Sequence, residues 1–217
     1  MTESTTGVTP ELIARITRAV YDRLAPLLDQ TRVVIGVSNH HVHLSQEDLC
    51  QLFGLDEFEV YKPVRQPGEF AAVQKVTVHG PRATFQDVRC MGPCRKLSQV
   101  ELSLTDCHTL GIEAPITQSG HLDQATWIDI EGPRGTIRRQ AAMVAARHLH
   151  MGPSHAEALG LHDQDVVRIE IGGVRGGVLD NVIVRTKDVW VPEIHLDLDE
   201  ANALGVATGD YGRIVVG

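Results

Sequence analysis

The chain has 217 residues, of which 42% are hydrophobic, so we expect a sizeable core and find no compositional sign of disorder. Its formal net charge of -8 disfavours a nucleic-acid-binding protein, and any anionic ligand must therefore meet a local cluster of arginine and lysine residues. The sequence has no apolar run of about 18 residues and no secretory leader, which predicts a soluble, cytoplasmic protein without a membrane contact.

The first predicted element is an amphipathic helix within residues 1–30. Pro10 stands in its first turn, and Pro26 should kink or end it. This helix either packs on its own domain or docks to another protein. Its apolar side chains recur at helical spacing, at Leu12, Ile13, Ile16, Val20, Leu24 and Leu27.

From Arg32 onward the sequence predicts short β-strands separated by turns rich in glycine and proline. Many short strands with little helix favour barrels or sandwiches, so we predict a mainly β (α+β) fold and not a doubly wound α/β sheet. The expected strands are 32–38, 73–79, 98–105, 126–130, 142–150, 165–171, 178–186, 192–198 and 211–216.

An internal repeat supports this organisation. Residues 156–160 read AEALG and residues 201–205 read ANALG, at an offset of 45 (201 minus 156), and His150 and His195 have the same offset. A looser third copy follows His43. Each unit predicts a strand that ends near a histidine, followed by a short capped helix closed by glycine.

The residues best suited to bind metal include two His-x-His triplets. In an extended strand, side chains two residues apart share one face and lie about 7 Å apart, so each pair can close on one ion. Strand alternation also places a glutamate and a third histidine opposite aliphatic faces. Two metals with three protein ligands each would keep positions open for substrate, as catalytic sites do. The six candidate ligands are His41, His43, Glu101, His148, His150 and His195.

A concentrated basic stretch lies close to one of these ligands. Residues 89–96 contain two arginines and a lysine, and Arg95 precedes Glu101 by six residues, just after a Gly-Pro turn. A guanidinium presents a planar fork that suits phosphate, so Arg95 is a candidate phosphate-binding residue. A solvated basic loop is the alternative.

Several motifs together carry a family resemblance that runs from Arg32 to Gly217. They are residues 36–38 leading to 41–44, residues 92–95 leading to 99–101, residues 147–153, and residues 193–196 with Asn202. With these motifs the chain resembles the PduL-type phosphotransacylases, the phosphate propanoyltransferases associated with bacterial microcompartments.

The resemblance implies a particular fold and two metal centres. It implies two small β-barrels capped by short helices, one formed by residues 31–40 plus 147–217 and the other by residues 41–146. It also implies two zinc ions, although histidine and carboxylate ligands would accept cobalt or nickel. One ion would be bound by His41, His43 and Glu101, and the other by His148, His150 and His195.

The resemblance further implies the substrate contacts and the partners. Arg95 matches the phosphate-site arginine, and Ser38, Lys62, Arg89 and Asn202 stand at positions that resemble coenzyme A contacts. The N-terminal helix resembles an encapsulation peptide, which would place the protein in the lumen of a bacterial microcompartment with shell or core proteins as partners. A homo-oligomer remains an open alternative.

The activity that follows is reversible transfer of a short acyl group, propionyl or acetyl, between coenzyme A and inorganic phosphate, within propanediol degradation. Two rivals stay open at this point. One is a binuclear metallohydrolase that cleaves a thioester or an amide. The other is a non-catalytic metal-binding module of a microcompartment.

Overall fold

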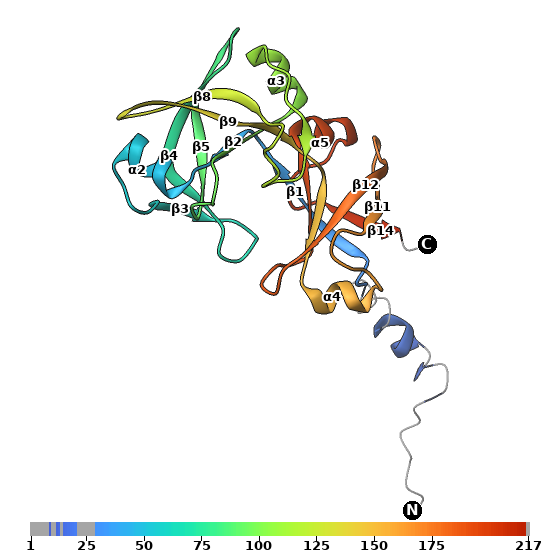
Figure 1. The fold of residues 1–217 in the computed structure, drawn as a ribbon. Coiled ribbons are helices and arrows are strands. Elements are labelled where there is room, and N and C mark those ends of the chain that lie inside the picture. Colours follow the sequence, from blue (N-terminus) through green and yellow to red (C-terminus); the bar gives the residue numbers. More distant parts are fainter. Residues whose placement is uncertain (1–8, 10–11, 14, 21–28, 216–217) are drawn as a thin grey trace, which may run out of the picture.

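The computed structural model describes residues 9, 12–13, 15–20 and 29–215 (Figure 1). The predicted N-terminal helix therefore lies partly outside the described residues. Of its positions, 12–13 and 15–20 are helical, and the four apolar side chains among them are exposed. In the described part of the chain, no helix is long and apolar enough to span a membrane.

The first and last parts of the ordered chain build one closed barrel. Its strand order is β1-β13-β10-β12-β11-β14, with β1 parallel to β13 and β10 parallel to β12. Strand β11 alternates exposed and buried residues, and its buried Val167, Ile169 and Ile171 join an aliphatic core inside the barrel. The strands are β1 (Arg32–Ser38), β10 (His148–Met151), β11 (Val166–Ile171), β12 (Gly177–Thr186), β13 (Glu193–Asp197) and β14 (Tyr211–Val215).

The middle of the chain forms a second ring of strands. Strands β4, β5, β2, β6 and β9 are neighbours in that order, and β8 pairs with both β9 and β4, which closes the ring. Strands β3 and β7 extend it at β4 and β9. The strands are β2 (His41–His43), β3 (Val60–Pro63), β4 (Phe70–His79), β5 (Thr84–Gly92), β6 (Gln99–Leu102), β7 (Ile116–Thr117), β8 (Thr126–Gly132) and β9 (Gly135–Ala145).

The mainly β fold with two barrels is thus confirmed, and the two barrels lie next to each other along the segments that join them (Figure 1). The expected strand 142–150 is two strands, because β9 ends at Ala145 in one barrel and β10 starts at His148 in the other. The expected strand 98–105 is shorter, because Ser103 caps a helix.

Short helices follow the four strands that carry the predicted metal ligands. Strand β2 is followed by α2 (Gln46–Phe53), β6 by α3 (Leu104–Leu110), β10 by α4 (Pro153–Ala158) and β13 by α5 (Leu198–Leu204). Ser45, Ser103 and Asp197 cap three of these helices with side-chain oxygens, and glycines in the left-handed region end the same three. The caps stop each strand sharply, so its ligands are held at one end of a barrel.

A buried carboxylate joins three elements of the second barrel. Asp48, in the first turn of α2, is 2% exposed and accepts hydrogen bonds from Arg139 of β9, with 2.6 Å from Nη2 to Oδ1. The hydroxyl of Ser98 donates to the same carboxylate, and Ser98 Oγ accepts from the backbone N–H of Ser45 at 2.9 Å. Asp48 therefore connects α2, β9 and the segment that leads into β6.

We expect Asp48→Ala to lower the free energy of unfolding by about 3 kcal/mol, because removing one partner of a buried pair leaves an uncompensated charge. The value lies at the lower end of the range for buried pairs, because the side chain of Arg139 is 37% exposed to solvent. Urea unfolding measures the change. Asp129→Ala is the matched control, because Asp129 pairs with the neighbouring Arg138 at 3.5 Å in an exposed position, where a loss below about 1 kcal/mol is expected. Equal losses for the two variants would contradict the role given to Asp48.

Candidate metal and substrate site

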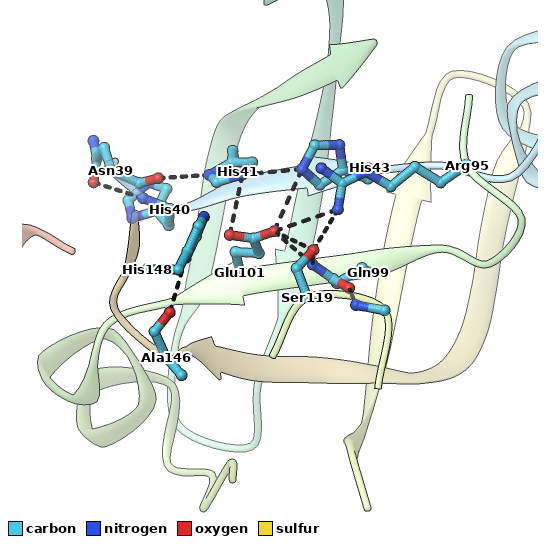
Figure 2. A network of polar contacts seen from close by, with 11 residues as sticks. Asn39, His40, His41, His43, Arg95, Gln99, Glu101, Ser119, Ala146 and His148 are labelled. Atoms are coloured by element: carbon cyan, nitrogen blue, oxygen red, sulfur yellow. Dashed lines mark hydrogen bonds and ion pairs between the residues drawn. The ribbon is translucent and has the colours of Figure 1, made fainter. Parts of the chain in front are cut away.

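The first ligand cluster lies where β2 and β6 pair. His41 is the register partner of Glu101, and His43, two residues on, points to the same face. His41 Nε2 lies 3.2 Å from His43 Nε2 and 3.5 Å from Glu101 Oε2, and His43 Nε2 lies 3.4 Å from Glu101 Oε1 (Figure 2). Ligands at zinc distances in a tetrahedron are separated by roughly 3.4 Å, so this spacing fits one metal ion.

Hydrogen bonding and burial hold this first cluster in the form that binds metal. His41 Nδ1 lies 2.9 Å from the carbonyl oxygen of Asn39, which can only accept, so Nδ1 donates and Nε2 keeps its lone pair. Burial lowers the pKa of His43 to about 4. Burial also acts to raise the pKa of Glu101, but His41, His43 and Arg95 outweigh it and hold that pKa well below its usual value. At neutral pH His43 is therefore neutral and Glu101 is ionised.

The second cluster lies where β10 and β13 pair. His148 is the register partner of His195, their rings stack with centroids 4.9 Å apart, and the ring centroid of His150 lies 4.5 Å from that of His195. The ligand atoms of the three histidines lie within 4.8 Å of one another. His148 Nδ1 donates to the carbonyl oxygen of Ala146 at 2.9 Å, as His41 does to Asn39 in the first cluster.

Burial and missing hydrogen-bond partners suit this second cluster to metal binding. Burial lowers the pKa of His148 to about 3 and lowers that of His150 as well, so both rings are neutral at physiological pH. Both ring nitrogens of His150 are buried without a hydrogen-bond partner, and His195 Nε2, also buried, lies 3.3 Å from Glu193 Oε2. Buried polar atoms are normally paired, and one nitrogen from each of the three rings suits a bound metal ion.

Both clusters face one cavity of about 790 Å³, which is lined by residues of both barrels. The clusters adjoin each other, because the charge of Glu101 in the first acts on the pKa of His148 in the second. Figure 2 shows His148 beside Glu101, with Arg95 on the opposite side of that carboxylate. A cavity of this size is typical of small-molecule and cofactor sites.

Arg95 reaches this cavity from the loop between β5 and β6. Its Nη1 donates to Ser119 Oγ at 2.6 Å and lies 3.7 Å from Glu101 Oε1, and its backbone N–H donates to the carbonyl of Leu44 at 2.9 Å. The guanidinium is therefore held at the first cluster while it still borders the cavity.

The predicted coenzyme A contacts divide into two groups. Ser38, Lys62 and Arg89 line the cavity. Arg89 also donates to the carbonyl of Ala72 at 2.9 Å. Asn202 is an exposed residue of α5 outside the cavity lining, so its role stays a prediction.

Sequence reasoning missed several residues that the structure brings into the site. Gln99 donates to Glu101 and to Ser119 Oγ, the latter at 2.9 Å, and so braces both a ligand and the partner of Arg95. Its position two residues before Glu101, on the same face of β6, was a usable signal. Arg185 and Trp190 also line the cavity, and only strand pairing between distant segments brings them there.

The geometry defines a two-barrel protein that presents two candidate metal clusters and an arginine to one substrate-sized cavity. A family model described as phosphate propanoyltransferase matches residues 34–207, and the chain belongs to this family. It is an enzyme of the phosphotransacylase class, which transfers acyl groups between coenzyme A and phosphate.

Curated relatives extend over most of the chain. It is 41% identical to the phosphate propanoyltransferase of Rhodopseudomonas palustris, over 94% of this chain and 96% of that protein. It is 43% identical to the Thermotoga maritima protein of the same name, over 84% of this chain and 89% of the relative. For the Clostridioides difficile protein the identity is 40%, with coverage of 84% and 88%.

Proposed function

We propose that this enzyme interconverts a short-chain acyl-CoA, propionyl-CoA or acetyl-CoA, and inorganic phosphate with acyl phosphate and coenzyme A, and that the two clusters each hold a metal ion. The observation that carries the proposal is the convergence of six suitable ligands and Arg95 on one cavity. Zinc fits the nitrogen and oxygen donors best, and cobalt or nickel would also be accepted.

The reaction joins a phosphate oxygen to the thioester carbonyl carbon and breaks the bond from that carbon to sulfur. The thiolate leaves with the bonding electrons and takes up a proton. Metal ions in such a site bind phosphate oxygens or polarise the carbonyl. Arg95 stabilises the negative charge that develops as the tetrahedral intermediate forms, and phosphate is the nucleophile, so no serine or cysteine nucleophile is needed.

Three further residues of the cavity lining suit the rest of coenzyme A. Lys62 and Arg89 supply positive charge for its phosphates, and Ser38 supplies a hydroxyl, all three from the cavity lining. The N-terminal segment, residues 1–30, is proposed to direct the enzyme into the lumen of a bacterial microcompartment through shell or core proteins, for propanediol degradation.

One assay separates this function from its rivals. Propionyl-CoA or acetyl-CoA is supplied with and without inorganic phosphate, and free thiol and acyl phosphate are measured together. We expect equal amounts of thiol and acyl phosphate, and only when phosphate is present. Thiol release that ignores phosphate would make the protein a hydrolase, and the absence of any turnover by the metal-loaded protein would make it a binding module.

A further inference from the structure

Arg185 is a cation of the cavity wall that forms no close ion pair within the described part of the chain. It lies on β12, which runs parallel to β10, and its register partner is His150 of the second cluster, so both side chains face the cavity. Among the described residues, no carboxylate lies within ion-pair distance of its guanidinium. Its recorded side-chain contact is with the ring of Trp190, whose centroid is 5.7 Å from Cζ.

Three other arginines of the same barrel form close ion pairs. Arg147 lies 2.7 Å from Glu200, Arg168 lies 2.7 Å from Asp180, and Arg213 lies 2.8 Å from Asp29. Partial burial lowers the pKa of Arg185 and the like charge of Arg95 lowers it further, whereas the more distant carboxylates of Asp163, Glu101 and Glu69 oppose these effects without reversing them. A partly desolvated guanidinium without a close ion pair is unfavourable, so an anion in the cavity would stabilise this position.

Trp190 fixes the place of this cation beside the second cluster. Its ring stacks on His150 with centroids 3.8 Å apart and planes inclined by 18°. Lys187 Nζ lies 5.6 Å from the same ring. The indole therefore has a metal-ligand candidate and two cations as neighbours, which places Arg185 close to the second cluster.

Arg185 and Arg95 approach the cavity from different barrels, the first from β12 and the second from the loop before β6. We propose that these two arginines form a clamp for the phosphate group that is exchanged with coenzyme A, with Arg185 as its second binding residue. The inference rests on the proposed function. Two planar guanidinium forks suit the several oxygens of one phosphate, and the bound anion would offset the repulsion between the two cations.

Coenzyme A itself carries a diphosphate, which is a second phosphate-type anion and an alternative ligand for Arg185. The position of Arg185 argues against binding of this diphosphate, because Arg185 is in register with His150, one of the candidate metal ligands. Lys62 and Arg89 line the cavity from β3 and β5 of the other barrel and are available for the coenzyme A phosphates.

The test compares Arg185→Gln and Arg185→Lys with the parent enzyme. We expect the KM for inorganic phosphate to rise about ten- to a hundredfold in Arg185→Gln, since a hydrogen bond to a charged group is lost. Arg185→Lys keeps the charge but loses the fork, so a smaller rise is expected. The KM for the acyl-CoA and the metal content should stay unchanged. Arg168→Gln is the matched control, because Arg168 is an exposed arginine of the neighbouring strand β11 and should change neither KM.

A second measurement does not depend on turnover. Inorganic phosphate should raise the melting temperature of the parent enzyme and of Arg168→Gln, and should do so much less for Arg185→Gln. A rise in the KM for acyl-CoA alone would assign Arg185 to coenzyme A and overturn the clamp, as would an unchanged KM for phosphate together with full stabilisation by phosphate. If the parent enzyme transfers no acyl group to phosphate, the proposed function fails, whereas the melting experiment still decides whether Arg185 binds phosphate.

Discussion

His148→Ala is expected to remove one bound metal ion and to lower acyl transfer about a thousandfold or more, since the metal contributes several kcal/mol to transition-state stabilisation. The reason is that His148, His150 and His195 converge with their ligand atoms within 4.8 Å, and a site with only two of these ligands binds metal weakly. His41→Ala should remove the other ion with a loss of similar size. Metal content measured by mass spectrometry, together with initial rates, checks both results.

The matched control is His162→Ala. The side chain of His162 is 84% exposed, pairs with Asp165 at 3.4 Å and belongs to neither cluster nor the cavity lining, so this variant should keep both metal ions and full activity. A double variant, His41→Ala with His148→Ala, should contain no bound metal. If either single variant instead keeps the metal content of the parent enzyme, the assignment of two separate three-ligand centres is wrong.

The local parts of this architecture could be predicted from the sequence. The repeat predicts strands that deliver histidine to a capped helix closed by glycine, and the structure confirms this at β2–α2 and β13–α5. At β10–α4 the strand and helix form as predicted, but the helix has no side-chain cap and its C-cap is Leu159. The signals are local, because cap residues such as Ser45 and Asp197 and the glycines that end α2 and α5 lie within a few residues of the helix. Strand β6 with α3 follows the same plan without sequence similarity to the repeat.

The non-local parts could not be predicted in the same way. Strand β5 has a positive φ at Asp87 and register shifts against β4, so its alternation of apolar residues is interrupted and the sequence did not indicate a strand. Closure of the second barrel depends on pairing of β8 with β4, through partners such as Thr77 and Glu131. Pairing between distant strands is set by packing and leaves no mark in the local sequence.

The candidate site shows the same division. Alternation within β2 and β6 was enough to place His41, His43 and Glu101 on polar faces, and the structure brings these three together. Arg185 was missed because its position depends on the parallel register of β10 and β12. A lone arginine in an apolar strand carries no signal of its own until its neighbour across the sheet is known.

Arg95→Ala is expected to lower the rate of acyl phosphate formation by about a hundred- to a thousandfold, as removal of one preorganised donor to a developing negative charge does in other enzymes. The metal content should stay nearly intact, because Arg95 is not a ligand and contacts the first cluster only through Glu101, at 3.7 Å. Initial rates of acyl phosphate and thiol formation, with metal analysis of the same samples, measure both quantities.

Two companion variants show what the guanidinium contributes. Arg95→Lys should recover part of the activity, since it keeps the charge but loses the donor geometry that reaches Ser119 at 2.6 Å. Arg138→Ala is the control, because Arg138 is an exposed arginine of β9 and should leave the rate unchanged. If Arg95→Ala loses metal together with activity, then Arg95 acts by holding Glu101 in place, and stabilisation of the transition state must come from other groups of the cavity.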